Sequence, residues 1–500
     1  MKMSRIGRFH NSELVIGLVG AVGSELFKVA QILEERLKRA DYETIHIKIS
    51  KDIIPLLIDI SEIQEANESN RISNLMDAGN KARKNADDNS ILALGAASKI
   101  SSLRYNDDGQ PKPRQKTAYI INSLKHPEEV LRLRDIYPRG FYLIGVHSDK
   151  KRRLEYLTND KGISDDDAKK LINRDEYEKF PYGQHVADTF HMSDFFVRDD
   201  GTDDRLKNSL WRIVDILFGD PFRTPTFDEY AMFLAFAASL RSADLSRQVG
   251  AVIGKKKEVI ATGANDCPQY GGGLYWPIIN KENGEISDSP DGRDYMRGKD
   301  SNTEQQKIII DEIIEKGEKE GLDASKLKNA LECSRIRDLT EYGRVVHAEM
   351  EALLSCARNQ ISAREGTLYC TVYPCHNCAK HIIAAGINRV VYIEPYHKSK
   401  AQEFHSESLC AGFEESDDAV NFEPFVGVGP RLFFDLFSMK LGSGLELKRK
   451  DGDGNKIDWK LEDSQLRLQM NPSSYLQFED AANKKFKEVV EFGREEKDND

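Results

Sequence analysis

Short apolar runs alternate with amphipathic stretches through the N-terminal part of the chain. The runs lie at 13–20, 44–49, 91–94, 118–121 and 140–146, with a further short run at 194–197. A glycine-containing turn and a stretch with helical spacing to about residue 40 follow the first run, and 206–217 has helical spacing as well. Strands that alternate with helices predict a parallel sheet covered by helices on both faces.

A second pattern begins after residues 219–226, where two prolines and a glycine predict a domain boundary. Residues 227–240 are hydrophobic nearly all round and predict a buried helix. Two apolar runs, 248–253 and 258–262, are joined by a basic turn and predict a hairpin. The polar, charged residues from about 277 to 335 predict an insertion, with a helix near 303–319 that forms a solvated surface, a lid or an oligomer contact.

The chain then returns to apolar elements. A helix is predicted after Val345-Val346-His347, a strand at 366–372, a helix that starts at Pro374 and stops at Gly386, and a strand at 389–393. From about 440 onward, apolar residues predict partial packing, with a frayed end beyond about 490. The expected domains are therefore 1–220, 227–440 and a C-terminal extension at 441–500.

Two motifs in the second domain carry the chemistry. His347-Ala348-Glu349 offers an imidazole and a carboxylate, and Cys375 and Cys378 form a Cys-x-x-Cys pair. Two thiolates and a histidine supply three ligands for zinc, and neither motif offers a fourth, so one position stays open for water. Zinc lowers the pKa of a bound water to about 7. Glu349 is placed to shuttle a proton, and the whole pattern is typical of zinc deaminases, which attack C4 of cytosine or C6 of adenine.

These motifs have two other interpretations, a structural zinc site and a redox pair. A structural zinc site needs four protein ligands, and a redox Cys-x-x-Cys pair needs neither His347 nor Glu349. Because both motifs are complete, the sequence favours the catalytic interpretation.

The composition of the chain limits the compartment in which this chemistry is expected and the class of substrate. No apolar run is long enough to span a bilayer, and Met1 to Arg5 lead into a polar segment, so no signal peptide and no membrane partner are expected. The 7 cysteines, an odd number in a long chain, favour a reducing, cytoplasmic compartment. A net charge of -11 argues against an extended polynucleotide-binding surface but leaves room for a small anionic substrate.

The N-terminal domain resembles a P-loop nucleotide-kinase fold. Its turn, with Gly20, Gly23 and Ser24, stands where a phosphate-binding loop belongs, and 123–130 and 174–176 resemble stretches of such kinases. The resemblance implies a parallel sheet and a nucleotide site at this loop.

The residues that such a loop needs are altered. Glu25, Leu26 and Phe27 occupy the places of its final glycine, lysine and serine. An acidic side chain repels phosphate, and the lysine and the magnesium-binding hydroxyl are missing, so ordinary ATP hydrolysis is not expected. The domain is expected to bind a nucleotide weakly, to sense one, to support assembly, or to be a scaffold with no ligand.

Residues 227–439 resemble the deoxycytidylate deaminase family. The motifs that carry this resemblance are 238–242, 247–252, 261–265, 347–349, 367–369, 374–380 and 385–392. The family implies an α/β/α cytidine-deaminase sandwich, one Zn²⁺ on His347, Cys375 and Cys378, and Glu349 as proton shuttle.

The same resemblance implies the substrate contacts. Asn265 is expected to contact the sugar and Arg241 the phosphate. Glu351 departs from the family pattern, where many members have asparagine, and this affects details of substrate contact rather than the reaction.

The whole arrangement resembles the two-domain anti-phage dCTP deaminases of bacteria, and the glycines at 271–273 followed by Leu274-Tyr275-Trp276 fit that group. The resemblance implies conversion of dCTP to dUTP, and also of dCMP to dUMP, which starves a phage of dCTP. It further implies a homo-oligomer. Because an enzyme that depletes a nucleotide pool is toxic and needs restraint, an inhibitory partner that acts through the N-terminal domain is also expected.

Three other functions remain open. A housekeeping dCMP deaminase for thymidylate supply uses the same active site but gives the N-terminal domain no task. A tRNA or DNA deaminase shares the zinc motifs, although the net charge argues against it. A nucleotide-sensing regulator would bind without reacting, and the intact Glu349 argues against that.

Overall fold

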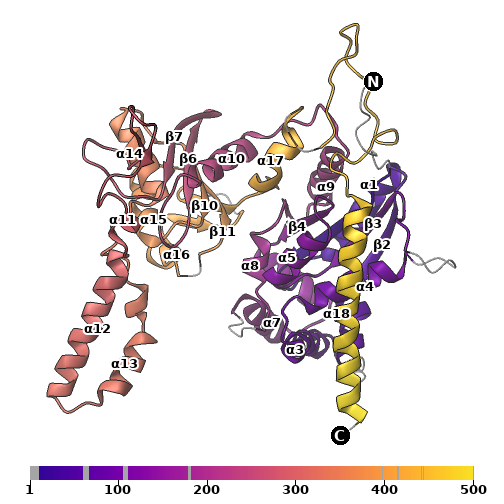
Figure 1. Cartoon of the computed structure of the whole chain (residues 1–500), viewed down its shortest axis with the longest axis horizontal. Coiled ribbons are helices and arrows are strands. Elements are labelled where there is room, and N and C mark those ends of the chain that lie inside the picture. The colour runs from indigo at the N-terminus through magenta and orange to yellow at the C-terminus, as the bar shows by residue number, and fades with distance from the viewer. Residues whose placement is uncertain are drawn as a thin grey trace. The chain divides into compact units, whose positions relative to one another are not determined.

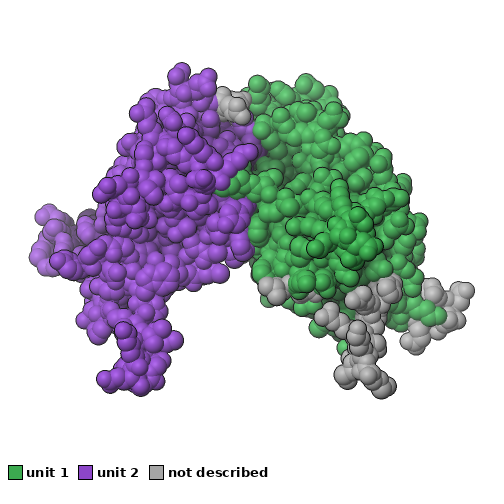
Figure 2. Space-filling view, turned by 90° about the horizontal axis from the view of Figure 1, so that it is seen from above, with its two compact units in different colours: residues 1–229, 426–500 green, residues 230–425 purple. Residues whose placement is uncertain are grey.

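The chain divides by its internal contacts into two units, coloured separately in Figure 2. Unit 1 comprises residues 1–229 and 426–500, and unit 2 comprises residues 230–425. The computed structural model describes residues 11–59, 67–104, 111–177, 182–396, 398–413, 416–440, 442 and 444–498. Residues 1–10, on which the expected absence of a signal peptide rests, lie outside these ranges. The domain ranges 1–220, 227–440 and 441–500 stay predictions.

Unit 1 is built on a six-stranded sheet in the order β14-β5-β4-β1-β3-β2. The strands are β1 (Leu14–Gly20), β2 (Glu43–Lys48), β3 (Thr117–Asn122), β4 (Phe141–His147), β5 (Phe195–Arg198) and β14 (Gly427–Val428). Strands β1 to β5 are parallel, as predicted, whereas β14 runs antiparallel to β5. Because β14 is short and comes from a distant part of the chain, the pattern of apolar residues did not indicate it.

Helices cover both faces of this sheet, as the sequence predicts. Alternate side chains of β1 point to opposite faces, so Leu14 and Ile16 pack with α1 and α9, whereas Val15 and Val19 pack with α4, α5 and α18. These helices are α1 (Leu26–Arg39), α4 (Ile91–Ser102), α5 (Pro127–Ile136), α9 (Asp203–Leu217) and α18 (Pro472–Asp498). The remaining helices of unit 1 are η1 (Ile49–Ile53), α2 (Ile54–Leu57), α3 (Glu68–Ala86), α6 (Lys150–Glu155), η3 (Tyr156–Asp160), α7 (Asp165–Tyr177), α8 (Val186–Phe190) and α17 (Pro430–Phe437).

The strand predicted at 91–94 is wrong, because these residues begin helix α4. Every residue from Ile91 to Ala97 is buried. A short apolar run has the same appearance in a buried strand and in a buried helix, so periodicity alone does not separate the two.

The C-terminal helix α18 is tied to unit 1 by a buried ion cluster. Arg104 Nε and Nη2 donate to the two carboxylate oxygens of Glu479 at 2.7 and 2.8 Å, and Arg104 also pairs with Glu13. Burial raises the pKa of Glu479, and the hydrogen bond from Arg104 opposes this rise. The helix continues to Asp498, through residues for which the sequence predicts a frayed end.

Unit 2 is built on a second six-stranded sheet, in the order β12-β13-β11-β10-β6-β7. Its strands are β6 (Gly250–Lys255), β7 (Glu258–Ala264), β10 (Thr367–Val372), β11 (Arg389–Glu394), β12 (Leu409–Ala411) and β13 (Val420–Pro424). The predicted hairpin is confirmed as β6 and β7, and β6 also runs antiparallel to β10. Strands β10, β11, β13 and β12 are parallel.

Two glycines let helices approach this sheet at backbone distance. Helix α10 (Phe227–Ser239) lies on one face, and α14 (Ala348–Arg358) and α15 (His376–Ala384) lie on the other. A Cβ on Gly250 would stand 1.9 Å from the carbonyl oxygen of Ala235 in α10, and one on Gly263 would stand 2.1 Å from that of Ala348 in α14. The result is the expected α/β/α sandwich.

Helix α10 is not buried on all sides, so that prediction is wrong. Ala231, Met232 and Ala235 are buried, whereas Tyr230 and Phe236 are exposed. Only one side of the helix reaches the sheet.

The predicted insertion carries its own small elements: β8 (Ile278–Ile279), β9 (Ile286–Ser287), α11 (Asp294–Arg297), α12 (Ser301–Lys319), α13 (Ala324–Glu332) and η4 (Arg335–Asp338). The helix predicted near 303–319 is confirmed as α12. Helices α12 and α13 lie side by side and extend from the rest of unit 2 (Figure 1). A last short helix of unit 2, α16 (Ala401–Phe404), follows β11. In the described ranges, no helix is both long and apolar enough to cross a membrane.

We expect Gly263→Ala to lower the free energy of unfolding by about 1–3 kcal/mol, because the added methyl must push α14 away from β7. Chemical denaturation of the full chain measures this loss. Thr262→Ser, at the exposed neighbouring position of β7, is the matched control and should leave the stability nearly unchanged. A Gly263→Ala protein as stable as the wild type would contradict the close packing.

Candidate metal centre and active site

Both halves of the metal motif lie at helix starts in unit 2. His347 is the N-cap residue of α14, and Cys375 is the N-cap residue of α15, which follows β10. The predicted helix start at Pro374 is wrong, since α15 begins at His376. Cys375 Sγ instead accepts a hydrogen bond from the backbone N–H of Cys378 at 3.5 Å, so the thiol satisfies an N–H of the first helical turn.

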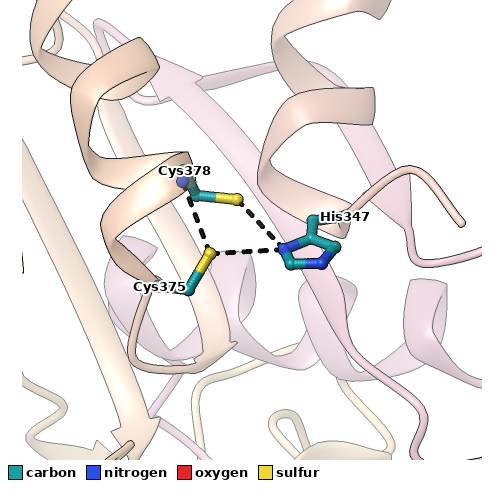
Figure 3. Close-up of side chains that lie close together, drawn as sticks. All are labelled: His347, Cys375 and Cys378. Atoms are coloured by element: carbon teal, nitrogen blue, oxygen red, sulfur yellow. Dashed lines mark hydrogen bonds between the residues drawn. The ribbon is translucent and has the colours of Figure 1, made fainter. Parts of the chain in front are cut away.

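The three side chains converge, as Figure 3 shows. His347 Nδ1 lies 3.4 Å from Cys375 Sγ and 3.4 Å from Cys378 Sγ. All three potential ligand atoms lie within 4.8 Å of one another. Cys378 is buried, Cys375 is half-buried and His347 is exposed, so the cluster opens toward solvent on the histidine side.

This donor set fits zinc. Tetrahedral ligands at about 2.3 Å for Zn–S and about 2.0 Å for Zn–N lie roughly 3.5 Å apart along an S···N edge, close to both observed distances. Among the described residues, this is the one group of three or more His, Cys, Asp or Glu side chains with ligand geometry. Three protein ligands with an open side match a catalytic zinc site rather than a closed structural one.

Glu349 lies behind the cluster, in the first turn of α14. It is only 4% exposed, and burial raises the pKa of its carboxyl group. The charge of His347 and a hydrogen bond from the Cys378 thiol oppose that rise. A carboxyl group with a raised pKa beside a metal site is suited to take up and release a proton near neutral pH.

The two thiols and the imidazole are strongly coupled. A hydrogen bond from Cys378 lowers the pKa of Cys375 to about 3, and the pKa of Cys378 is raised in turn. The hydrogen bond with Cys375 raises the pKa of His347 to about 9, although partial desolvation of this otherwise exposed residue opposes the rise. The lowered pKa of Cys375 favours its thiolate form, and the raised pKa values of Cys378 and His347 make proton release part of metal binding.

Asn265 lies on the segment that pairs with the chain just before His347. Asp266, the next residue, forms an antiparallel bridge with Val346, which places Asn265 opposite His347. The Asn265 side chain accepts from Val249 N at 2.7 Å and donates to Arg247 O at 2.9 Å. Its amide therefore holds the loop before β6 next to the site, and its contact with a sugar stays a prediction.

Arg241 is held by the segment that begins the insertion. Its guanidinium donates to Tyr275 O at 2.7 Å and stacks on Trp276, with the guanidinium carbon 3.7 Å from the ring centroid. Burial lowers the pKa of Arg241. Glu351, which departs from the family pattern, is nearly buried and pairs with Arg358. The phosphate contact expected of Arg241 stays a prediction.

The structure places Asp244 and Tyr396 near the cluster, and Arg247 beside Tyr396. The sequence argument singled out none of these side chains as site residues. The negative charge of Asp244 contributes to the raised pKa of His347, and the negative charge of Cys375 contributes to the raised pKa of Tyr396. The guanidinium of Arg247 lies 5.7 Å from the Tyr396 ring centroid. Arg247 is the first residue of the motif 247–252, and Tyr396 lies two residues after the end of β11. These positions in the chain are the sequence signal that could have indicated both residues.

The remaining predicted site residues, Gly20, Gly23 and Ser24, lie in the loop between β1 and α1 of unit 1. Gly23 has φ +90°, a conformation that suits glycine. The N–H of Val22 in this loop is already bonded to the carboxylate of Asp175 at 2.7 Å. Nucleotide binding by this loop stays a prediction.

Comparison with known proteins centres on the same region. A model of the cytidine and deoxycytidylate deaminase zinc-binding region matches residues 225–394, which include both metal motifs. The deoxycytidylate deaminase of Enterobacteria phage T4 is 32% identical over 167 residues, which cover 33% of this chain and 77% of the phage protein. That of Saccharomyces cerevisiae is 27% identical over 287 residues, or 56% of this chain and 76% of the yeast protein.

A crystal structure of the dCMP deaminase from cyanophage S-TIM5, in complex with dCMP and dUMP, aligns at 20% identity and a TM-score of 0.23. It covers 41% of this chain and 100% of the phage chain. The sequence matches, which extend over most of the phage T4 relative and include the whole His-Cys-Cys cluster, lead to one conclusion: this chain belongs to the zinc-dependent cytidine and deoxycytidylate deaminase family.

Proposed function

We propose that this chain hydrolytically deaminates deoxycytidine nucleotides at a zinc site held by His347, Cys375 and Cys378. The observation that carries the proposal is the convergence of these three donors on the solvent side of the buried Glu349. A structural zinc site would neither leave one side open nor need a buried carboxyl group in the adjoining helix turn.

In this proposal the chain's own residues manage the protons. Bound zinc supplies a water that is nucleophilic at neutral pH. Glu349 takes one proton from the attacking water and gives it to N3 of the cytosine. It then takes the proton of the hydroxyl group now on C4 and gives it to the amine as the C4–N bond breaks and C4=O forms. One water is consumed, the C4–N bond breaks, and uracil and ammonia are the products. Its raised pKa suits Glu349 to act as both base and acid.

Asn265 and Arg241 are the proposed contacts to the rest of the nucleotide. Asn265 is supported by its place opposite His347, which puts it within reach of a sugar whose base enters the cluster. Arg241 is the proposed phosphate contact. Its guanidinium stacks on Trp276, and this contact holds the guanidinium in one orientation.

Within this class we propose dCTP as the main substrate and dCMP as a second one, with depletion of dCTP in antiviral defence as the biological role. The support is the resemblance of the two-domain arrangement to the anti-phage dCTP deaminases of bacteria. A cytoplasmic homo-oligomer, restrained by a partner that acts through unit 1, belongs to the same proposal. The relatives named above are deoxycytidylate deaminases, which favours a dCMP deaminase for thymidylate supply as the second candidate.

The test is a product assay on the purified chain with dCTP, dCMP, CTP and a deoxycytidine oligonucleotide in parallel. We expect dUTP from dCTP at the highest rate and no product from the oligonucleotide. Turnover of dCMP alone would replace the proposal by the second candidate. Deamination of the oligonucleotide alone would overturn both.

We expect Cys375→Ser to lose bound zinc and deaminase activity together, because one of three protein ligands to the metal is gone. Metal content by mass spectrometry and the product assay measure the two losses. Cys333→Ser is the matched control, since Cys333 is a free, exposed cysteine of the same unit, and it should keep both. Full zinc occupancy in Cys375→Ser would contradict the ligand assignment.

We expect Glu349→Gln to keep its zinc and to lower kcat by at least about a hundredfold, since the amide fills the same space but carries no proton between substrate atoms. Steady-state kinetics with metal analysis on the same sample separate this effect from metal loss. Glu258→Gln, at an exposed position of the same sheet, should leave kcat unchanged. A Glu349→Gln enzyme with near-normal kcat would exclude the carboxylate as proton carrier.

A further inference from the structure

The loop between β1 and α1 in unit 1 occupies a place where open α/β sheets bind ligands. Strand β1 lies between β3 and β4, and the strand order along the sheet reverses there, so the carboxyl end of β1 is a topological switch point. The loop's backbone N–H groups and the start of α1 (Leu26–Arg39) favour a negative charge at this place.

A negative charge from the chain itself already occupies the loop. The Asp175 side chain, on α7, is fully buried. Its Oδ2 accepts from Val22 N at 2.7 Å, and its Oδ1 accepts from Lys125 Nζ at 3.2 Å. Lys125 Nζ also donates to Gly20 O at 2.9 Å. A backbone N–H and a lysine ammonium are the partners that a bound phosphate oxygen would need, and here both serve a carboxylate.

A second helix from the same segment closes over the loop. Arg152 on α6 pairs with Glu25, and the backbone of Arg153 packs directly on Gly23. A Cβ on Gly23 would stand 2.9 Å from Arg153 O. On the other side of the segment, Arg174, next to Asp175, donates to Ser73 Oγ at 2.8 Å and pairs with Asp77. The segment that carries α6 and α7 is thus held closed by contacts within the chain.

Two hydroxyl groups at this edge have no hydrogen-bond partner among the described residues. Ser24 Oγ, in the loop, is one of them. Ser148 Oγ is the other, in a residue that is 6% exposed and lies two positions after Val146, the residue of β4 that pairs with Gly20. Buried hydroxyl groups normally have hydrogen-bond partners. These two are therefore available to bond a polar ligand at this edge, in addition to the bonds that Asp175 already makes.

We propose that the Asp175 carboxylate is a built-in stand-in for a phosphate group, and that it masks an anion site formed by the Val22 N–H, Lys125 and Ser24. A phosphate-bearing nucleotide competes with Asp175 for this site and must displace α7 to bind. The low nucleotide affinity expected of this loop then comes from internal competition as well as from the altered loop residues. The proposal concerns unit 1 alone and does not rest on the proposed deaminase function.

The test compares binding of inorganic tripolyphosphate and of ATP to the full-length wild type and to Asp175→Ala by isothermal titration calorimetry. If the docked carboxylate leaves the site open in less than about a tenth of the molecules, its removal should tighten tripolyphosphate binding by at least about tenfold. Asp167→Ala is the matched control, because Asp167 is a half-exposed residue of the same helix that pairs locally, with Lys170 and Ser164, and it should leave binding unchanged.

Lys125→Met in the Asp175→Ala background should remove the gained affinity, since it deletes the cation that faces the anion. Asp175→Asn, which keeps the size of the side chain and removes its charge, serves if Asp175→Ala does not fold, as judged by circular dichroism. A folded variant that binds tripolyphosphate no more tightly than the wild type overturns the proposal. A gain for ATP without a gain for tripolyphosphate overturns it too, because the base rather than the anion position would then be responsible.

Discussion

The active site of unit 2 depends on the backbone contact between α14 and β7 at Gly263. Without a side chain at this position, the first turn of α14 lies directly against the strand, 2.1 Å from where a Cβ would stand. That contact fixes the height of His347 and Glu349 above the sheet. The βαβ connection through β10, α15 and β11 then brings Cys375 and Cys378 to the same edge. Metal ligands that are far apart in the chain meet because two helix starts share one sheet edge.

The chemistry of the cluster follows from this shared edge. Both helix starts present N–H groups and positive dipole ends, which stabilise thiolates, and Cys375 accepts one of those N–H groups directly. The same packing removes water from Glu349 and raises its pKa. One arrangement therefore favours the ionised form of the Cys375 thiol and raises the pKa of the Glu349 carboxyl group on the neighbouring helix.

Unit 1 has a similar sheet edge at the loop between β1 and α1, but there the chain's own side chains occupy the polar groups. Its loop after β1 also combines a strand end with a helix start, but a carboxylate from α7 and a lysine complete it internally. The edge of unit 2 is open at the metal cluster, whereas the edge of unit 1 is satisfied internally at the loop after β1. The family membership of the chain accordingly rests on unit 2.

The sequence by itself determined the α/β class, most strands and the complete metal motif, because alternating apolar residues and a His-x-Glu with a Cys-x-x-Cys are local signals. The strand expected at 91–94 and the full burial of α10 failed, since burial depends on neighbours that come from elsewhere in the chain. Only the tertiary structure decided that Arg241 stacks on Trp276, that Asn265 faces His347 and that Asp175 fills the loop of unit 1. Each of these contacts joins residues on separate elements, and their distance is set by packing rather than by spacing along the chain.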